Sequence, residues 1–502
     1  MLLNVYLDRL IKIIKKEKMI KKIKGHWIIL ILLALAQFMV VLDVSIVNVM
    51  LPTVQKVFHM SQTNLQWVVT AYTLTFGGFL LLGGRAADLY GRRKIFLTGV
   101  FMFTLASLLD GLSQSGTMLI VLRAFQGLAG AFMSPAALSI ILVTYKQGHD
   151  RNVALSVWGA VASGGAAVGV LLGGILTQYF GWRWNFLVNV PVGLFVFFWA
   201  TRLLPIHESE ETDKSLDLPG AITITGGLML LVYALQKAPA NGWTSHTTIY
   251  SLLVSFALIS VFVFNELKAR KPLVPFKIFR YKNLAAANLL QLTIAGALFS
   301  VFFFTSLYVQ QILHFSPVKT GLCFLIIPLF IGATASNAPK LIKKIGYKRI
   351  LSIAPIISAS GLFYLSFIPV HGTYFKDVMP GLMLMGSGLG FIFVSLLVAG
   401  TSGVEKQLSG LASGLINTAQ QLGGSLGLAI ITGQVAASTT RYLVNAHAQN
   451  SATVIAGTVH GYQVAFKIAA VFALIAGLIA IFLIKNVKPS ENHEETTKMS
   501  AA

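Results

Sequence analysis

The chain has 502 residues, of which 55% are hydrophobic and only 11% charged, and its formal net charge is +22. A soluble globular protein carries about 25% charged residues, so the composition excludes that class and indicates a polytopic membrane protein. Long apolar runs, in place of short alternating strands, exclude an outer-membrane barrel. The basic charge does not indicate nucleic-acid binding, because Lys and Arg are distributed along the chain as membrane topology requires.

The sequence predicts fourteen apolar spans, because about 20 helical residues cross the ~30 Å hydrocarbon core of a bilayer. They cover 27–51, 65–83, 95–114, 118–143, 153–179, 184–204, 218–236, 246–265, 284–312, 318–338, 350–369, 378–400, 410–436 and 463–484. An even number of spans places both termini on one side. Segments on that side hold 31 of the 39 Lys and Arg residues, which predicts a cytoplasmic-membrane protein with both termini in the cytoplasm.

The predicted fold is all-α, with two six-helix halves and two extra helices between them. Its parts are a basic segment at 1–26, a first half at 27–204, linkers with two helices at 205–283, a second half at 284–485 and a cytoplasmic tail at 486–502. Duplicated halves of this kind are typical of secondary transporters, with the substrate path between them.

The segment before the first span alternates Leu and Ile with Lys, which predicts a basic amphipathic helix on the inner membrane surface. No small-residue cleavage site follows it, so a cleaved signal peptide is not expected. A start of translation at Met19, which leaves only a short basic lead, stays an alternative.

Two charged residues stand inside predicted spans of the first half. Asp43 lies about eight residues from the outer end of the first span, and Arg123 lies about five residues from the outer end of the fourth. An unpaired charge in the membrane is costly, so we expect the two to pair. Burial favours a neutral carboxyl and a nearby guanidinium favours a carboxylate, so this pair could take up and release a proton. A permanent ion pair that joins two helices is the alternative.

The segment GRAADLYGRRK joins the second and third spans, and a cytoplasmic gate that forms and breaks is predicted there. Its candidate residues are Gly84, Asp88, Gly91, Arg92 and Arg93. Glycines allow tight turns and close helix approach, and Asp88 can pair with Arg92 or with a helix N-terminus. Ordinary positive-inside charge is the alternative. The segment PKLIKKIGYKRILS at 339–352 is its counterpart in the second half.

Small and polar residues inside spans give two further groups of candidates. Several glycines have the spacing that allows close helix packing, and such packing could seal the interface between the halves. They are Gly165, Gly169, Gly173, Gly174, Gly423 and Gly427. Polar residues that could line a cavity or bond to other helices are Asn48, Gln126, Asn417 and Gln421. Asp110 falls near the outer end of a span, where water is close, so a site role is not favoured for it.

Signatures of catalysis are missing from the sequence. It contains no GxxxxGK[ST] phosphate loop and no HExxH, and its ten His residues are scattered. Cys323 is the single cysteine and is expected to be a packed apolar residue. We therefore expect no enzyme activity, no metal site and no cofactor other than a coupling proton.

Four motifs in order resemble signatures of the major facilitator superfamily, and the chain is most similar to its drug:proton antiporter branch with fourteen helices. They are LDVSIVNVMLP at 42–52, GRAADLYGRRK at 84–94, LRAFQGLAGA at 122–131 and FGWRWNFLVNVPVG at 180–193. The resemblance implies an exporter that expels lipophilic drug-like molecules in exchange for protons. It also implies proton coupling at Asp43 and Arg123, and a gate at the segment that joins spans two and three.

The chain departs from the family pattern at two places. It reads Gly169-Val170 where the antiporter signature has Gly-Pro, which removes a helix-bending element. Lys343 stands where the first half's gating pattern has an acid, so only the first-half gate is complete.

Three functions follow from this sequence. The first is export of lipophilic molecules by proton antiport, with the bilayer and small molecules as partners. The second is a dedicated exporter of one endogenous metabolite, antibiotic or siderophore, and the third is a non-transporting membrane sensor or scaffold. The sequence identifies no nucleic-acid partner and leaves an accessory periplasmic partner unknown.

Overall fold

The computed structural model describes residues 2–145, 148–205, 216–269, 272–281, 283–405, 408–446 and 450–486, and these residues form helices and short connections without strands. The first half holds α1 (Leu2–Phe58), α2 (Gln62–Leu65), α3 (Trp67–Tyr90), α4 (Arg92–Gly111), α5 (Gly116–Thr144), α6 (His149–Tyr179), α7 (Trp184–Leu187) and α8 (Asn189–Leu203). The central pair is α9 (Leu218–Asn241) and α10 (His246–Lys268). The second half holds η1 (Phe276–Arg280), α11 (Leu284–Gln311), α12 (Pro317–Phe324), α13 (Ile326–Ile345), α14 (Tyr347–Leu365), η2 (Tyr374–Val378), α15 (Met379–Thr401), α16 (Ser409–Asn445) and α17 (Ser451–Leu483).

The prediction of fourteen apolar spans is confirmed: the described residues contain fourteen helical segments long and apolar enough to cross a membrane. Residues with short polar side chains cap the N-termini of several of these helices. The Ser115 hydroxyl accepts a hydrogen bond from the Met118 amide at the start of α5, and Asn450 does the same for the Thr453 amide at the start of α17. Such caps satisfy backbone N–H groups that a helix end leaves unpaired.

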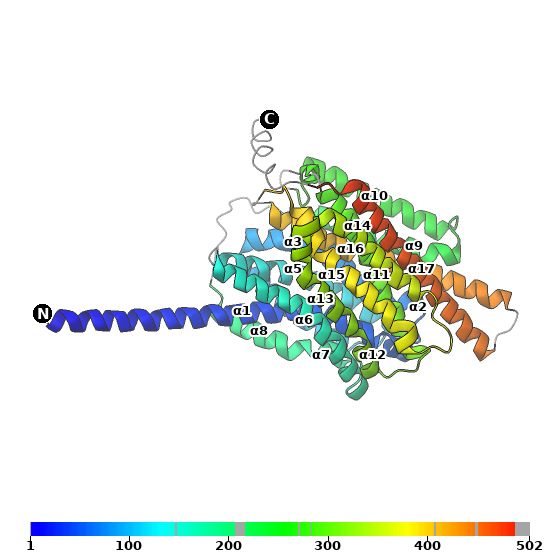
Figure 1. Ribbon diagram of the computed structural model, residues 1–502, viewed down its shortest axis with the longest axis horizontal. Helices are drawn as coiled ribbons and strands as arrows, with labels where there is room; N and C mark the ends of the chain where they lie inside the picture. The colour runs from blue at the N-terminus through cyan, green and yellow to red at the C-terminus, as the bar shows by residue number, and fades with distance from the viewer. Residues whose placement is uncertain are drawn as a thin grey trace.

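Some boundaries differ from the prediction. The helices α16 and α17 extend well beyond the predicted spans 410–436 and 463–484, and residues 437–445 and 451–462 contain no Pro that would break them. Their connected ends project beyond the neighbouring helices (Figure 1). The segment 2–26 continues α1 in a straight line away from the bundle, rather than forming a separate helix along a surface (Figure 1).

The central helices lie on one flank of the bundle, and α9 packs on both halves (Figure 1). On the first-half side, the Trp67 indole N–H donates to the Gln236 side-chain oxygen at 2.8 Å. On the second-half side, a Cβ added to Gly433 of α16 would lie 2.8 Å from the Gln236 carbonyl oxygen. The helix α9 therefore fills the seam between α3 and α16, and α10 packs on its other side.

The polar contacts between the halves lie toward one end of the molecule. We call the end where α1 enters the bundle at Trp27 and α17 finishes the terminal end, and the opposite end the far end. In the far half of the bundle, the Ser306 hydroxyl donates to the Asn48 carbonyl at 2.6 Å, and Gln310 donates to the Val49 carbonyl at 2.8 Å. Gln62 donates to the Tyr462 hydroxyl at 3.1 Å. These contacts hold the far end closed.

Replacing Gly174 by Val is expected to open the far end. A Cβ at Gly174 would lie 2.5 Å from the Pro317 carbonyl oxygen of the second half, so α6 and α12 could no longer meet. We expect faster labelling of a Gln310→Cys reporter, in a Cys323→Ser background, by a maleimide that cannot cross the membrane. Gly164→Val is the control, since nothing lies within 4 Å of a Cβ there. Equal labelling in both variants would contradict this account of closure.

Candidate functional site

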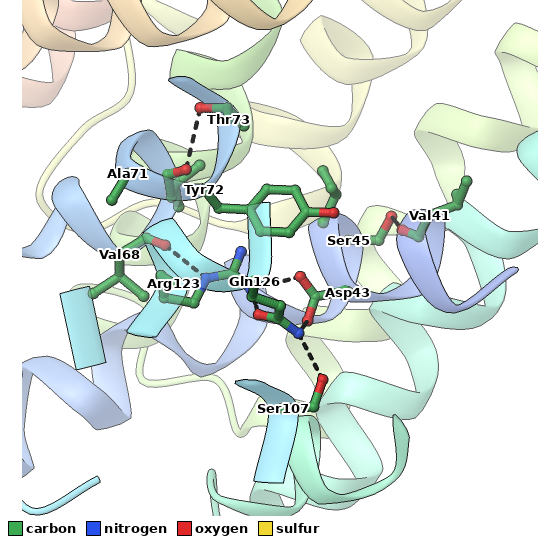
Figure 2. A network of polar contacts seen from close by, with 12 residues as sticks. Val41, Asp43, Ser45, Val68, Ala71, Tyr72, Thr73, Ser107, Arg123 and Gln126 are labelled. Atoms are coloured by element: carbon green, nitrogen blue, oxygen red, sulfur yellow. Dashed lines mark hydrogen bonds and ion pairs between the residues drawn. The ribbon is translucent and has the colours of Figure 1, made fainter. Parts of the chain in front are cut away.

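Asp43 of α1 and Arg123 of α5 form an ion pair inside the first half, at the depth that the sequence predicts. Oδ2 of Asp43 lies 2.5 Å from Nη1 of Arg123, and the two side chains are 0% and 1% exposed. Figure 2 shows the two side chains pointing toward each other from separate helices. Because neither charge reaches solvent, each depends on the other for compensation.

Gln126, one turn along α5 from Arg123, joins this pair to a further helix. Its Nε2 donates to Oδ1 of Asp43 at 2.8 Å and to the Ser107 hydroxyl of α4 at 2.7 Å (Figure 2). Its Oε1 accepts from Nη1 of Arg123. Both oxygens of Asp43 are therefore hydrogen-bonded, and three helices meet at one polar centre.

Arg123 is held by more than its charge partner. Its Nε donates to the Val68 carbonyl of α3 at 3.0 Å, and its guanidinium carbon lies 4.3 Å from the centroid of the Tyr72 ring. The Phe186 ring lies 5.6 Å away. A planar guanidinium can donate several hydrogen bonds in fixed directions and can also pack against the neighbouring rings. A lysine ammonium would reproduce only the charge.

The arrangement can exchange one proton with a change of conformation. In the observed state the carboxylate is stabilised by a guanidinium and an amide, so the charged pair is favoured. A movement that separates α1 from α5 would leave a buried carboxylate without compensation and would favour its neutral form. The geometry thus permits coupling, and the proton-coupling role of the pair stays a prediction.

Part of this centre was not predicted from the sequence. Gln126 is predicted only as a candidate cavity residue, although its spacing of three from Arg123 places both on one helical face. Ser107 and Tyr72 are not predicted at all, because Ser and Tyr are common in apolar spans and carry no pattern of their own.

The expectation for Asp110 is wrong. Its position near the end of a span suggests access to water, but the side chain is 0% exposed. The turn after α4 explains the burial, because α7 covers it: a Cβ on Gly111 would lie 2.7 Å from Leu187.

The predicted gating segment is a helix with one break, rather than a loop. The helix α3 runs through to Tyr90, and Gly91 alone separates it from α4, with φ of 94°. This left-handed region favours glycine, so the tight turn expected at Gly91 is present. Gly84 is inside α3, and the nearest atom to a Cβ there is 3.7 Å away, so it makes neither a turn nor a close contact. The close approach occurs instead at Gly83, where a Cβ would lie 2.0 Å from the Ala131 carbonyl oxygen.

The charged side chains of this segment contact the first half. Asp88 pairs with Arg92 at 3.0 Å, and Nε of Arg92 donates to the Ser139 hydroxyl at 2.5 Å. Arg93 donates to the Thr201 carbonyl of α8. In the second half, Gly346 separates α13 from α14 with φ of 81°, which repeats the turn at Gly91. The two junctions therefore match in backbone, and a gating role for the segment stays a prediction.

Asp88→Asn is expected to change transport more than stability. The Asp88–Arg92 pair is partly exposed, and pairs of that kind contribute about 0.2–1 kcal/mol. We expect a melting temperature in detergent close to that of the unmodified protein, together with several-fold slower substrate export. Unchanged export, or a large loss of melting temperature, would argue against a gate.

The predicted packing glycines do make close contacts, mostly within their own half. Gly165, Gly169 and Gly173 of α6 face α1, and Cβ atoms added there would lie 3.1, 2.7 and 2.8 Å from side-chain atoms of α1. Gly423 and Gly427 of α16 face α11, with the nearest backbone atoms at 2.2 Å for each. Among these six glycines, only Gly174 of α6 packs against the other half, where it faces α12.

The predicted cavity residues lie in different environments. Asn48 is buried and donates to the Val44 carbonyl within α1, beside the closed far end. Gln421 is partly buried, and its Cβ lies 2.8 Å from a Cβ added to Gly77 of α3. Asn417 is the exposed member of the set. With Gln126 in the ion-pair centre, the structure does not bring the four together.

Comparison with known proteins places this chain in a family. The family model described as Major Facilitator Superfamily matches residues 33–428. The puromycin resistance protein of Streptomyces alboniger is 37% identical over 464 residues, which cover 91% of each chain. The cephamycin export protein of Amycolatopsis lactamdurans is 35% identical over 407 residues, covering 80% of this chain and 83% of the relative.

Solved structures show the same fold at low sequence identity. A bacterial homologue of the human lysosomal transporter Spinster, in an inward-facing and unoccupied conformation, has a TM-score of 0.70 at 14% identity and covers 94% of this chain and 98% of its own. The xylose transporter of E. coli, in an inward open conformation, has a TM-score of 0.61 at 13% identity over 94% and 99% of the two chains. With fourteen candidate spans and this family match, the chain belongs to the major facilitator superfamily of membrane transporters.

Proposed function

We propose that the protein exports lipophilic, drug-like small molecules across the cytoplasmic membrane in exchange for protons, by alternating access. Relatives named for puromycin resistance and cephamycin export support the substrate class. The observation that carries proton exchange is the buried pair of Asp43 and Arg123, since a titratable group with a breakable partner deep in the membrane is what coupling requires.

The excess of Lys and Arg on one side supports an orientation with both termini in the cytoplasm. In that orientation the far end faces outward, and the observed conformation is closed toward the outside. Substrate enters from the cytoplasm or the inner leaflet while Asp43 is paired. Opening of the far end then releases substrate and admits a proton to the carboxyl.

Protonation of Asp43 is the step that links the two movements. A neutral carboxyl no longer compensates the charge of Arg123, so the contact between α1 and α5 weakens. The pair re-forms when the proton leaves toward the cytoplasm. The glycine face of α6 lies along α1 beside this carboxyl, with Gly169 against Ser45 and Gly173 against Ile46, which suits a helix that slides during the cycle.

Transport in inverted membrane vesicles tests this proposal. We expect a lipophilic cationic dye to accumulate inside energised vesicles, and a protonophore to release it. Dye accumulation that stays unchanged when the proton gradient is collapsed would contradict antiport. The Gly169-Val170 pair makes this test essential, because α6 is a continuous helix without the proline of the antiporter signature.

A dedicated exporter of one natural product is the second candidate. It is favoured by relatives named for single antibiotics, such as the lincomycin resistance protein of Streptomyces lincolnensis, 33% identical over 411 residues. Resistance conferred against many unrelated compounds supports the first function, and resistance against a single compound supports the second.

A further inference from the structure

Asp110, in the last turn of α4, is a second acidic group buried in the first half. Its side chain is 0% exposed, and among the described residues neither of its carboxyl oxygens has a hydrogen-bond partner. This differs from Asp43, where both oxygens are bonded. A buried carboxyl without partners is costly as an anion and far less costly as a neutral acid.

Asp110 continues the polar centre toward the far end. Ser107 lies one turn earlier on the same face of α4, and its hydroxyl accepts from Gln126, which also donates to Asp43. Asp110 is one residue from the end of α4 at Gly111, and Leu112 beyond it is exposed. A small opening of the far end would therefore hydrate Asp110 before it hydrates Asp43.

The charges around Asp110 do not compensate a second anion. Arg123 from α5 and Asp43 from α1 both act on it electrostatically, but these two are already paired with each other. The Tyr72 hydroxyl from α3 has no partner among the described residues and belongs to the same centre. Arg183, before α7, donates to the Ser113 carbonyl at 3.2 Å. An ionised Asp110 would thus leave the centre with one uncompensated negative charge.

We infer that Asp110 is a second proton-binding site of the transport cycle, loaded in this far-closed conformation. The carboxylate takes a proton from water when the far end opens, and the acid holds that proton while the far end is closed. The proton leaves when substrate binding and opening of the terminal end hydrate the centre. This inference rests on the proposed proton exchange and adds one proton to it, so that the cycle moves a proton at Asp110 besides the one at Asp43.

The number of protons per substrate tests the inference. In proteoliposomes at zero membrane potential, the logarithm of the steady-state accumulation ratio of a lipophilic dye rises with the imposed pH difference, with a slope set by the number of protons exchanged. We expect Asp110→Asn to lower this slope by one, which is about a tenfold smaller ratio per pH unit. Asp110→Glu, which keeps a carboxyl, should restore the slope.

Asp377→Asn is the matched control, because it removes a carboxyl that bonds to Thr373 at the far end of the second half and should leave the slope unchanged. A zero slope in the unmodified protein would overturn proton exchange altogether. A positive slope that Asp110→Asn leaves unchanged would overturn only this inference.

A second measurement does not depend on the variant folding. Carbodiimides modify protonated carboxyls in apolar surroundings, so Asp110 in the unmodified protein should be labelled and identified by peptide mass spectrometry. Labelling should decline as the pH is raised. Absence of label at Asp110 at every pH tested would count against the inference.

Discussion

Asp43→Asn is expected to abolish gradient-driven export while the protein still reaches the membrane and binds substrate. Asparagine keeps the shape and can still bond to Gln126, but it cannot take up a proton. It also leaves Arg123 buried without a counter-charge, and breaking a buried pair in this way costs about 3–5 kcal/mol. Dye accumulation in energised vesicles measures the first effect, and the melting temperature in detergent measures the second.

The double variant Asp43→Asn with Arg123→Gln separates coupling from stability. Removing both charges avoids an uncompensated ion, and such replacements are often neutral. We expect the melting temperature to recover toward that of the unmodified protein while gradient-driven export stays absent. Recovery of export in the double variant would show that the pair only joins two helices, which is the alternative that the sequence leaves open.

Gly427→Ala is expected to cause a large loss of folded protein. Its Cβ would lie 2.2 Å from the Gly296 Cα, so two backbones in direct contact, α11 and α16, would have to move apart. Overpacking of this kind costs about 1–3 kcal/mol. We expect a lower melting temperature and a smaller monodisperse peak in size-exclusion chromatography.

Gly410→Ala in the same helix is the matched control. Nothing lies within 4 Å of a Cβ at Gly410, and alanine favours a helix over glycine by about 0.8–1 kcal/mol. This variant should match or slightly exceed the unmodified protein in melting temperature. Similar losses in both variants would mean that glycine flexibility, rather than close helix contact, matters in α16.

The sequence was sufficient to predict the helices and the ion pair of Asp43 and Arg123, because both follow from local rules. The length of an apolar run predicts a membrane span. Two opposite charges at equal depth inside the membrane are expected to pair, because either charge would be costly without a partner. The turn at Gly91 follows from similar reasoning. The residue that joins the pair to a third helix, Gln126, was identified only as a polar group, because its role depends on which helix faces it.

Features set by helix packing were predicted poorly. Asp110 is buried because α7 covers the end of α4. The position of a residue within its own span does not reveal which other helix covers it. Which half a glycine faces is likewise a property of rotation about the helix axis. That is why Gly173 and Gly174, adjacent in sequence, contact different halves.

Proton exchange at Asp43 is tested most directly by proton movement that substrate alone drives. Proteoliposomes that contain a pH-sensitive dye and no initial pH difference are given a gradient of a lipophilic cation, with the membrane potential clamped. We expect proton flow opposite to the cation in the unmodified protein and none in Asp43→Asn, although cation exchange between equal pools continues in both. Equal proton flow in the two proteins, or none in the unmodified one, would contradict proton exchange at Asp43.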